Sequence, residues 1–494
     1  MELFLIGHTY RYAVEQIMLM LFPEERPTYP ARPSGALRAR VTLREGAQWL
    51  TAETAITAPD GRSFRGVSRV RLADLGSGLQ AERLRQRAVK QSFYRAAVRF
   101  HGEKPVWGAL SGIRPALLMR RLMDEGPDSD AHALRRFIAL YDVSPERAAL
   151  TLDAARAARE AQRTLAPEDV MLYVGVPFCP TRCAYCSFVS QSVEKSMKLI
   201  PDFVAALEQD IRATADAARA ARRRVRAVYF GGGTPTTLSA AQLDAVLTLL
   251  ENCFDLSACT ELTVEAGRPD TITREKLEAL RAHGVTRVSV NPQTMSDRVL
   301  EAIGRRHTAE DVLRALELVR AVGGFAVNMD LIAGLPEDDT AGFARTLDTV
   351  LSLGVENVTV HTLALKKGSR ILLEGTRLPD AAAVGEMLAY AAARLREGGY
   401  APYYLYRQKF MSGGFENVGW CRPGTENLYN ICIMEELCSI LAMGAGASTK
   451  LADGNGLLKR VFAPKYAKEY IDGIEAVCAD KRRITEFFQG ENIP

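Results

Sequence analysis

This sequence lacks the features that would place a chain in a membrane or carry it out of the cell. No apolar run approaches the roughly 20 residues that a membrane-spanning helix needs. The opening segment MELFLIGHTYRYAVEQIMLMLF has an early glutamate and scattered charges, without the basic start and small-residue cleavage site of a signal peptide. We therefore expect neither a membrane span nor an export signal.

Cysteine is scarce as well, with nine in 494 residues. The total is odd and six of the nine are scattered, which does not suit a disulfide framework. This usage is typical of a reduced compartment, so the expected location is the cytoplasm. The six scattered residues are Cys253, Cys259, Cys421, Cys432, Cys438 and Cys478.

The chain also lacks a strong excess of charge of one sign. Its 63 Lys and Arg nearly balance 59 Asp and Glu, which leaves a net charge of +4. So small a charge calls for neither nucleic acid nor an anionic membrane, and no nucleic-acid partner is expected. Repeats and low-complexity tracts are absent too, and the composition is that of an ordinary globular protein. The length allows two or three domains, and we expect a monomer.

Residue patterns divide the chain into three zones. Residues 1–165 begin with alternating runs such as WLTAETAIT, and the Asp-Gly of ITAPDGRSFRGV is typical of a hairpin turn. From about residue 80 the pattern becomes helical. This zone predicts an N-terminal α+β domain. The last zone, residues 379–494, opens with an alanine-rich helical run and predicts a mainly helical C-terminal domain.

The middle zone, residues 166–378, alternates short strand-like runs with helical segments. Six runs are rich in β-branched or aromatic residues: MLYVGV, VRAVYF, ELTVEA, RVSVNP, AVNMDLI and NVTVHTLAL. Strand–helix alternation favours an α/β fold with a parallel sheet and right-handed crossovers. Six units predict a partial (β/α)6 barrel, in which chemistry gathers at the carboxyl ends of the strands.

Three of the nine cysteines, Cys179, Cys183 and Cys186, lie within eight residues, directly after the first of these strands. Clustered thiolates usually bind zinc or an iron–sulfur cluster. A structural zinc site needs a fourth ligand and usually a second close Cys or His pair, which the sequence lacks. The spacing favours three ligands of a [4Fe–4S] cluster with its fourth iron open. Zinc or packed thiols stay as the alternatives.

The other candidate residues also follow strands. FGGGTPTTL comes after the second strand, where glycines let the backbone approach a ligand closely, and it is not a Walker loop because Gly-Lys-Ser/Thr is missing. Glu265, Gln293 and Asp330 lie at or after the ends of later strands. Taken singly, the two carboxylates could be structural ion-pair partners and the glutamine a helix cap.

The ordered set of motifs resembles a known family. C-x3-C-x2-C followed by GGGTP resembles the radical S-adenosylmethionine superfamily, whose barrel is the partial (β/α)6 radical SAM barrel. More narrowly, LYVGVPFCPTRCAYCSF, YFGGGTPTTL, LTVEAGRPD, RVSVNPQT, IGRRHT and NMDLIAGLPED resemble the oxygen-independent coproporphyrinogen III oxidase (coproporphyrinogen dehydrogenase) family. The N-terminal extension and YYLYRQKFMSGGFENVGW are similar to its HemZ-type branch. The likeness is strong over residues 170–365.

The resemblance implies the cofactors and the residues that bind them. Cys179, Cys183 and Cys186 would hold a [4Fe–4S] cluster, whose open iron would take the amino and carboxylate groups of S-adenosyl-L-methionine. One or two molecules of that cofactor are implied. No catalytic side chain is implied beyond those that hold the cluster and cofactor. The implied cofactor-binding residues are Tyr173, Tyr185, Gly232, Gly233, Thr234, Glu265, Gln293, Arg305, Asp330 and Ala364.

The resemblance also implies a reaction, the oxygen-independent oxidative decarboxylation of coproporphyrinogen III to protoporphyrinogen IX in heme biosynthesis. A radical made by cleaving the cofactor would take hydrogen from a propionate, and loss of carbon dioxide and one electron would leave a vinyl group. The implied partners are the porphyrinogen substrate and an unidentified electron donor and acceptor. A heme-binding chaperone of the same family, without this turnover, is the alternative.

Two positions depart from the family pattern. Phe188 stands where the well-studied dehydrogenases carry a further cysteine. The motifs therefore support the assignment of the substrate less strongly than the assignment of the cofactors. Chaperones carry His-Asn-x-x-Tyr-Trp beyond the barrel, whereas the nearest stretch here, ENLYN at residues 426–430, has neither the His nor the Trp. Arg114 and Arg407 are candidates to bind propionates. His361 either faces the barrel mouth or packs inside.

Overall fold

The computed structural model describes residues 1–490 apart from 126–129, 187–190, 193–195, 365–370, 372–377, 409–411 and 454–456. These residues form two compact units, Met1–Leu152 and Asp153–Pro494. Three domains were expected, and the structure differs because residues 379–494 add strands to the sheet of the middle zone. The first boundary falls inside helix α5 (Pro145–Arg163).

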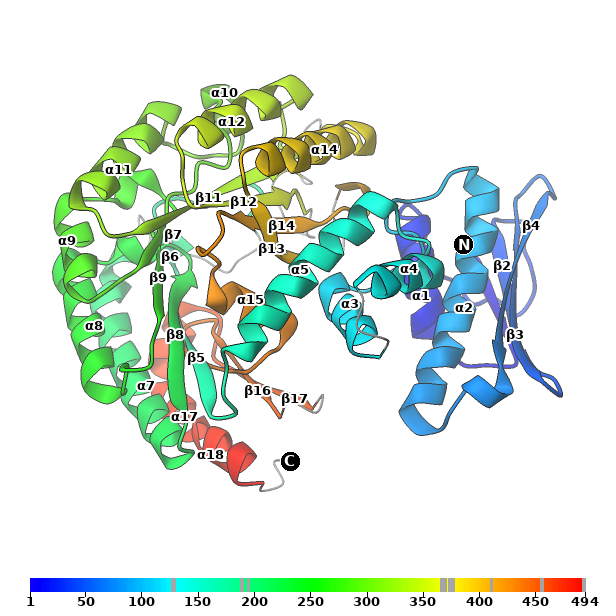
Figure 1. The fold of residues 1–494 in the computed structure, drawn as a ribbon, viewed down its shortest axis with the longest axis horizontal. Coiled ribbons are helices and arrows are strands. Elements are labelled where there is room, and N and C mark those ends of the chain that lie inside the picture. The colour runs from blue at the N-terminus through cyan, green and yellow to red at the C-terminus, as the bar shows by residue number, and fades with distance from the viewer. Residues whose placement is uncertain are drawn as a thin grey trace. The chain divides into compact units, whose positions relative to one another are not determined.

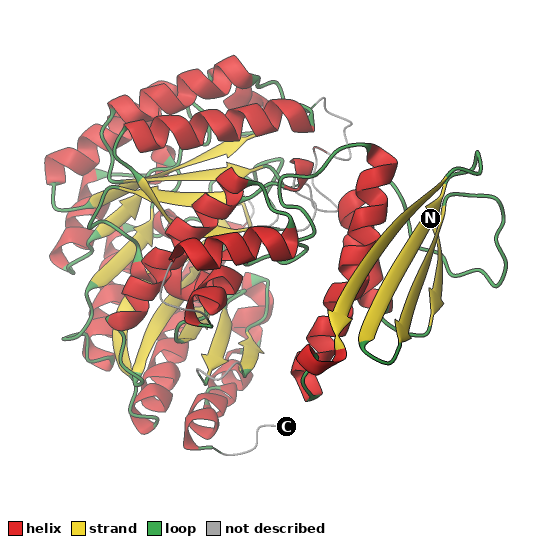
Figure 2. Ribbon diagram, turned by 45° about the vertical axis from the view of Figure 1, so that its right-hand side comes forward, coloured by secondary structure: helices red, strands yellow, loops and turns green. Residues whose placement is uncertain are grey.

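The first unit contains a four-stranded sheet in the order β1-β2-β3-β4 (Figure 2). β1 runs parallel to β2, and the other neighbours are antiparallel. The hairpin expected around Asp60-Gly61 joins β3 to β4. The elements of this unit are β1 (Glu2–Ile6), α1 (Arg11–Leu21), β2 (Arg38–Glu45), β3 (Trp49–Thr57), β4 (Ser63–Arg71), α2 (Gly78–His101), α3 (Pro115–Asp124) and α4 (Asp130–Tyr141).

Helix α2 packs on one face of this sheet. The Thr54 and Ser92 hydroxyls lie 2.8 Å apart in the buried contact. Gly66 allows the close approach, because a Cβ there would lie 2.1 Å from the backbone oxygen of Ser92. The core between sheet and helices is apolar, with Val41, Ile56 and their neighbours almost fully buried. This segment thus has the predicted α+β character, because helices cover one face of its sheet and bury an apolar core there.

The six strands expected in the middle zone form a parallel array in the order β12-β11-β10-β9-β8-β5. Helices follow the strands and lie along the outside of the curved sheet (Figure 1). The strands are β5 (Asp169–Val176), β8 (Arg224–Gly232), β9 (Glu261–Glu265), β10 (Arg287–Ser289), β11 (Ala326–Ala333) and β12 (Asn357–Thr362). The helices are α7 (Ile200–Ala220), α8 (Ala240–Cys253), α9 (Arg274–Ala282), α10 (Asp297–Ala302), α11 (Ala309–Val322) and α12 (Thr340–Ser352).

The last zone extends this sheet at both ends. β13 (Ala401–Tyr406) and β14 (Asn417–Cys421) join beside β12, with antiparallel pairings. β15 (Ser439–Gly444) pairs parallel to β5 and carries β16 (Ser448–Ala452) and β17 (Leu458–Phe462). The sheet therefore stays open, with β13 and β17 as its edges. The expected helices are α14 (Ala381–Glu397), α15 (Leu428–Glu435), α16 (Ala467–Asp472), α17 (Ile474–Asp480) and α18 (Arg482–Gln489).

A buried polar cluster ties the C-terminal helices to α7. The Asp210 carboxylate receives hydrogen bonds from the Tyr470 hydroxyl at 2.7 Å and the Gly444 N–H at 3.0 Å, and pairs with Lys481 Nζ at 2.6 Å. A buried carboxylate needs such a full set of partners to offset its lost hydration. No helix in the described part of the chain is both long and apolar enough to cross a membrane.

Candidate functional site

A cavity of about 590 Å³ opens at the carboxyl ends of the parallel strands in the second unit. Its wall contains every residue to which the sequence assigned a cofactor or cluster contact, so the fold gathers positions spread over nearly 200 residues. Their binding roles stay predictions. These thirteen residues are Tyr173, Cys179, Cys183, Tyr185, Cys186, Gly232, Gly233, Thr234, Glu265, Gln293, Arg305, Asp330 and Ala364.

The three thiols lie on one loop after β5, which its backbone holds in place. Cys179 ends the short strand β6 (Phe178–Cys179), which pairs with β7 (Gln191–Ser192). The Ala184 N–H donates to the Ile303 carbonyl at 2.9 Å, and Arg268 Nη1 donates to the Thr181 hydroxyl at 2.9 Å. These two anchoring bonds of the loop do not use sulfur.

The surroundings of the thiols suit an iron–sulfur cluster. All three are half-buried and line the cavity, and the Thr234 hydroxyl donates to Cys179 Sγ at 3.4 Å. Thiolate is the ligand form of cysteine, and neighbouring donors and cations favour it. Among the described residues, no three Cys, His, Asp or Glu side chains converge on a single metal ion. A [4Fe–4S] cluster binds each thiolate through a different iron, so its ligands stand apart.

The glycine run at the end of β8 brings backbone close to this loop. The Gly233 N–H donates to the Val176 carbonyl and the Thr234 N–H to the Phe178 carbonyl, both at 2.7 Å. A Cβ at Gly233 would lie 2.4 Å from the Phe178 oxygen, so no other residue fits without moving the strand that carries Cys179. The run thus locks β8 to the cysteine loop and exposes backbone to the cavity.

Glu265 is the last residue of β9, which pairs with β8 on the side away from β5. The Tyr229 hydroxyl donates to Glu265 Oε1 at 2.5 Å. Burial in the cavity wall raises the pKa of Glu265 to about 7, against the lowering effect of the Tyr229 hydrogen bond, and the charge of Asp330 adds to the rise. The carboxyl group is therefore poised to change charge near neutral pH.

This raised pKa predicts a pH-dependent stability. Between the unfolded value of 4.5 and about 7, the folded protein keeps the Glu265 proton that the unfolded chain has lost, so stability falls as pH rises. We expect Glu265→Gln to raise the unfolding temperature of the cofactor-free protein more at pH 8 than at pH 5. Thermal unfolding followed by circular dichroism measures this. Glu278→Gln, at an exposed site on α9, should follow the wild type at both pH values, and equal curves for all three proteins would contradict the prediction.

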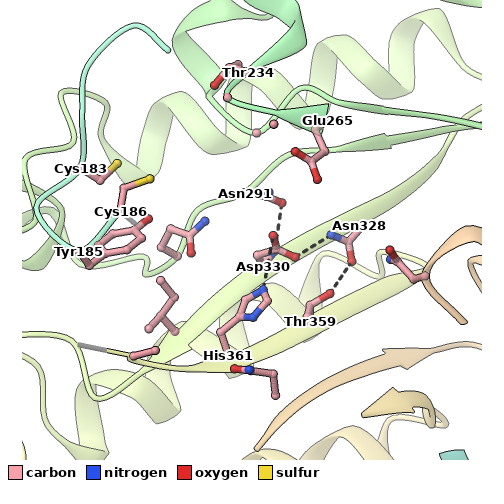
Figure 3. Close-up of a pocket in the computed structure, with 18 of the residues that line it drawn as sticks. Cys183, Tyr185, Cys186, Thr234, Glu265, Asn291, Asn328, Asp330, Thr359 and His361 are labelled. Carbon is pink, nitrogen blue, oxygen red and sulfur yellow. Dashed lines mark hydrogen bonds and ion pairs between the residues drawn. The ribbon is translucent and has the colours of Figure 1, made fainter. Parts of the chain in front are cut away.

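Asp330 lies at the centre of a polar network on β11 and β12 (Figure 3). Asn328 Nδ2 donates to Asp330 Oδ1 at 2.8 Å, and His361 Nε2 lies 3.7 Å from Asp330 Oδ2. Burial alone would raise the pKa of Asp330, but the hydrogen bond and charge of His361, together with Asn328 and Thr359, hold it below the usual value. Asp330 is therefore a fixed negative charge in the cavity wall.

Gln293 and Arg305 reach the cavity from the segments after β10. Gln293 has a φ of 69°, a left-handed conformation that is rare outside glycine, and its N–H donates to the Asp330 carbonyl at 2.9 Å. Such strain persists where the surroundings over-determine it, which is common at functional sites. Arg305 Nη1 donates to the Asn291 carbonyl at 2.6 Å, and Nη2 donates to the Tyr185 hydroxyl at 3.4 Å. Arg305 thereby links the cysteine loop to the end of β10.

Sequence reasoning missed several lining residues. Asn328 shares its strand face with Asp330, and the two-residue period could have found it. Tyr404 and Tyr406 line the cavity, whereas the preceding Tyr403 does not line it and packs in an apolar cluster that also includes Tyr404. Tyr229, stacked against Tyr429 with ring centres 4.5 Å apart, also faces the cavity. No local signal brings Tyr429 there, because it comes from α15.

Three further sequence candidates have clear locations. His361 lines the cavity beside Asp330. Arg407 is buried, donates to the Gly414 carbonyl at 2.8 Å and is not among the lining residues of the cavity, so its propionate contact stays a prediction without support from the cavity wall. Arg114 precedes α3 in the first unit. Phe188 lies outside the described residues.

Comparison with known proteins agrees with this geometry. The model of the Radical SAM superfamily matches residues 173–350. The chain is 37% identical over 388 residues to the oxygen-independent coproporphyrinogen-III oxidase-like protein HemZ of Bacillus subtilis (strain 168), covering 77% of each chain. It is 32% identical over 265 residues to the heme chaperone HemW of Mycobacterium tuberculosis, covering 53% of this chain and 64% of the chaperone.

A solved structure shares the fold. It is the coproporphyrinogen III oxidase HemN from Escherichia coli, described as a radical SAM enzyme. The two structures superpose with a TM-score of 0.52 and 26% sequence identity, over 65% of this chain and 72% of that one. The likeness extends beyond the segment matched by the superfamily model, because that segment is shorter than the superposed part.

Proposed function

Because this chain belongs to the radical SAM superfamily and, within it, to the family of the coproporphyrinogen-III oxidase-like protein HemZ, we propose that it converts coproporphyrinogen III to protoporphyrinogen IX without oxygen. The family implies a [4Fe–4S] cluster and S-adenosyl-L-methionine. When bound, these groups supply hydrogen-atom abstraction from an unactivated C–H bond. An external one-electron donor and an acceptor complete the balance, and we place the reaction in the cytoplasm.

One observation carries the proposal. The thiols and Glu265 share a single cavity with Gln293, Arg305, Asp330 and Ala364, the positions that resemble the second cofactor site of the dehydrogenases. A chaperone without turnover has no need for this complete set. The cavity also continues past these residues to a wall built by β13, α15 and β16, where a substrate can lie beside the cofactor positions.

The chain's own residues have distinct tasks in this scheme. Asp330, kept ionised by His361, offers acceptor oxygens to hydroxyl or ammonium groups. Arg305 lines the cavity, and a guanidinium group can pair with a carboxylate of the cofactor. Tyr404, Tyr406 and Tyr429 give the cavity an aromatic wall, and aromatic side chains there leave less room for water. Dry surroundings protect a reactive radical from side reactions.

The substrate end of the cavity offers a cation for a propionate. Three of the described residues that line the cavity are Lys or Arg: Arg268, Arg305 and Lys450, the last of them on β16. Gln408, Asn417 and Asn430 lie in the same wall and can donate hydrogen bonds. We propose that Lys450, rather than Arg407, meets a carboxylate of the porphyrinogen.

A heme chaperone is the second candidate, because several relatives at 25–32% identity bear that name. Such a protein would hold heme tightly and leave porphyrinogens unchanged. The ENLYN stretch of the wall, which contains Tyr429 and Asn430, lacks the histidine and tryptophan that the chaperones carry there. This absence of an axial-type ligand favours the dehydrogenase.

Anaerobic turnover distinguishes the two candidates. We expect the reduced, cluster-loaded protein to consume coproporphyrinogen III and to release carbon dioxide and 5′-deoxyadenosine in equal amounts. Lys450→Gln should raise KM for the porphyrinogen about tenfold, the loss of one charged hydrogen bond, and leave cleavage of the cofactor without substrate unchanged. Lys459→Gln, on β17 and outside the cavity, is the matched control. Tight heme binding and transfer to apo-proteins without consumption of porphyrinogen would support the chaperone instead.

A further inference from the structure

The charge of this chain is divided unequally between its two units. Residues 1–152 contain 23 Lys and Arg against 16 Asp and Glu, a net charge of +7, whereas residues 153–494 carry −3. The whole-chain value of +4 hides this division. The expectation that no nucleic acid binds rested on that total, whereas the first unit alone has the positive charge that an anionic partner requires.

The excess charge gathers on one face of the four-stranded sheet. Successive side chains of a strand point to opposite faces. Val41, Ala52 and Ile56 point to the face covered by α2, and the arginines of β2 and β4 point to the other. Figure 2 shows helices against one face of these strands and none on the other. The arginine face comprises Arg38, Arg40, Arg44, Arg65, Arg69 and Arg71, of which five are exposed and Arg38 is half-buried.

The pairing of the strands arranges these arginines in two rows. Arg40 lies opposite Ala55, which lies opposite Arg65; Arg44 lies opposite Thr51, which lies opposite Arg69. The rows are two strand spacings apart, roughly 10 Å, and arginines two residues apart in a row are roughly 7 Å apart. Short side chains of β3 form the floor between them. The arginine face thus has two cationic rows with the side chains of β3 between them.

Four of these six guanidinium groups, those of Arg40, Arg44, Arg65 and Arg69, have no ion-pair partner in the part of the chain that the structure describes. Glu53 lies on the floor, opposite Thr42 and Val67, and is the one carboxylate between the two rows in the described part of the sheet. An unpaired set of cations on a flat surface attracts an extended anion.

The remaining groups on this face identify the anion. Trp49 is 38% exposed at one end of the arginine face, with the Arg71 guanidinium 5.4 Å from its ring centre. We propose that the arginine face binds single-stranded nucleic acid, with arginines on phosphates, Trp49 stacked on a base and Glu53 accepting hydrogen bonds from base amino groups. An acidic peptide fits less well, because its side chains would be repelled by Glu53 and would gain little from Trp49.

Fluorescence anisotropy with labelled, mixed-sequence 20-nucleotide RNA and DNA tests this on the full-length protein. We expect wild-type binding to weaken as salt rises, by about 0.7 logarithmic units per unit of log salt for each phosphate contact. The triple variant Arg40→Ser/Arg65→Ser/Arg69→Ser should bind about tenfold or more weakly, with a salt slope reduced by about two. Circular dichroism reports whether its sheet remains folded.

A matched control removes the same charge elsewhere in the same unit. Arg83, Arg87 and Arg135 lie on α2 and α4, outside the arginine face, so their triple serine variant should keep most of the affinity. Trp49→Ala should weaken binding about tenfold and leave the salt slope unchanged, since stacking is not electrostatic. The proposal is overturned if wild-type protein binds neither oligonucleotide, if both triple variants lose affinity equally, or if poly-glutamate or anionic vesicles bind better than the oligonucleotides do.

Discussion

Alanine at Cys179, Cys183 or Cys186 is expected to abolish iron binding, the largest effect that this structure predicts. When one of the three thiolate ligands is removed, no other cysteine can take its place, because the other cysteines do not line the cavity. Anaerobically reconstituted wild-type protein should contain about four iron and four sulfide and absorb near 400 nm, following the cluster stoichiometry. Each variant should lose the iron, the sulfide and the absorption, and with them all turnover.

The structure also predicts that these variants remain folded. Two bonds that anchor the cysteine loop, from the Ala184 N–H to the Ile303 carbonyl and from Arg268 to Thr181, do not involve sulfur and remain in each variant. The unfolding temperature of the metal-free variants should therefore stay close to that of the metal-free wild type. Cys253→Ala, outside the cavity, is the control and should keep its iron. Uptake of zinc with no iron by the wild type would show that the cluster assignment is wrong.

Asp330→Ala is expected to keep the cluster and lose most of the affinity for S-adenosyl-L-methionine. The carboxylate is held ionised by His361 and oriented by Asn328, so it is a prepared acceptor for a charged or hydroxyl group of the cofactor. A lost charged hydrogen bond is worth about 1.5–3 kcal/mol, or roughly ten- to a hundredfold in affinity. Equilibrium binding to the oxidised, cluster-loaded protein measures this loss.

Two variants check that the effect belongs to the carboxylate charge. Asp330→Asn keeps the shape and one acceptor oxygen, so it should lie between wild type and Asp330→Ala. Glu301→Ala removes an exposed carboxylate on α10 and should bind the cofactor normally. Iron content should be equal in all of them. Unchanged affinity in Asp330→Ala would mean that the Asp330–His361 pair serves only to join β11 to β12.

Much of the second unit could be read from local pattern. The six parallel strands lie where the β-branched runs predicted them, because alternation and burial of a central strand are properties of a few consecutive residues. The three thiols are also local, since eight residues contain all of them. The candidate cofactor residues came from a resemblance in motifs that follow those strands, and the carboxyl ends of parallel strands necessarily meet at one edge of the sheet.

Other features depend on which strands pair across the chain. β15 pairs with β5, and β14 with β12, although far more than 200 residues separate the first two. No local signal encodes such a pairing, so the C-terminal zone was expected to be a separate domain. The same pairing turns Tyr404 and Tyr406 toward the cavity, places Tyr429 against Tyr229 and buries Arg407 away from the site.

By itself, the sequence determined the strand–helix alternation, the clustered thiols and the family to which they belong. Only the tertiary structure decided which polar groups share a cavity and which charges share a surface. A strand pattern says that Arg40 and Arg65 point out of the same sheet face, but register decides that Ala55 separates them. The physical reason is that propensity and periodicity act over a few residues, whereas pairing and packing free energies are shared among residues that are distant in the chain.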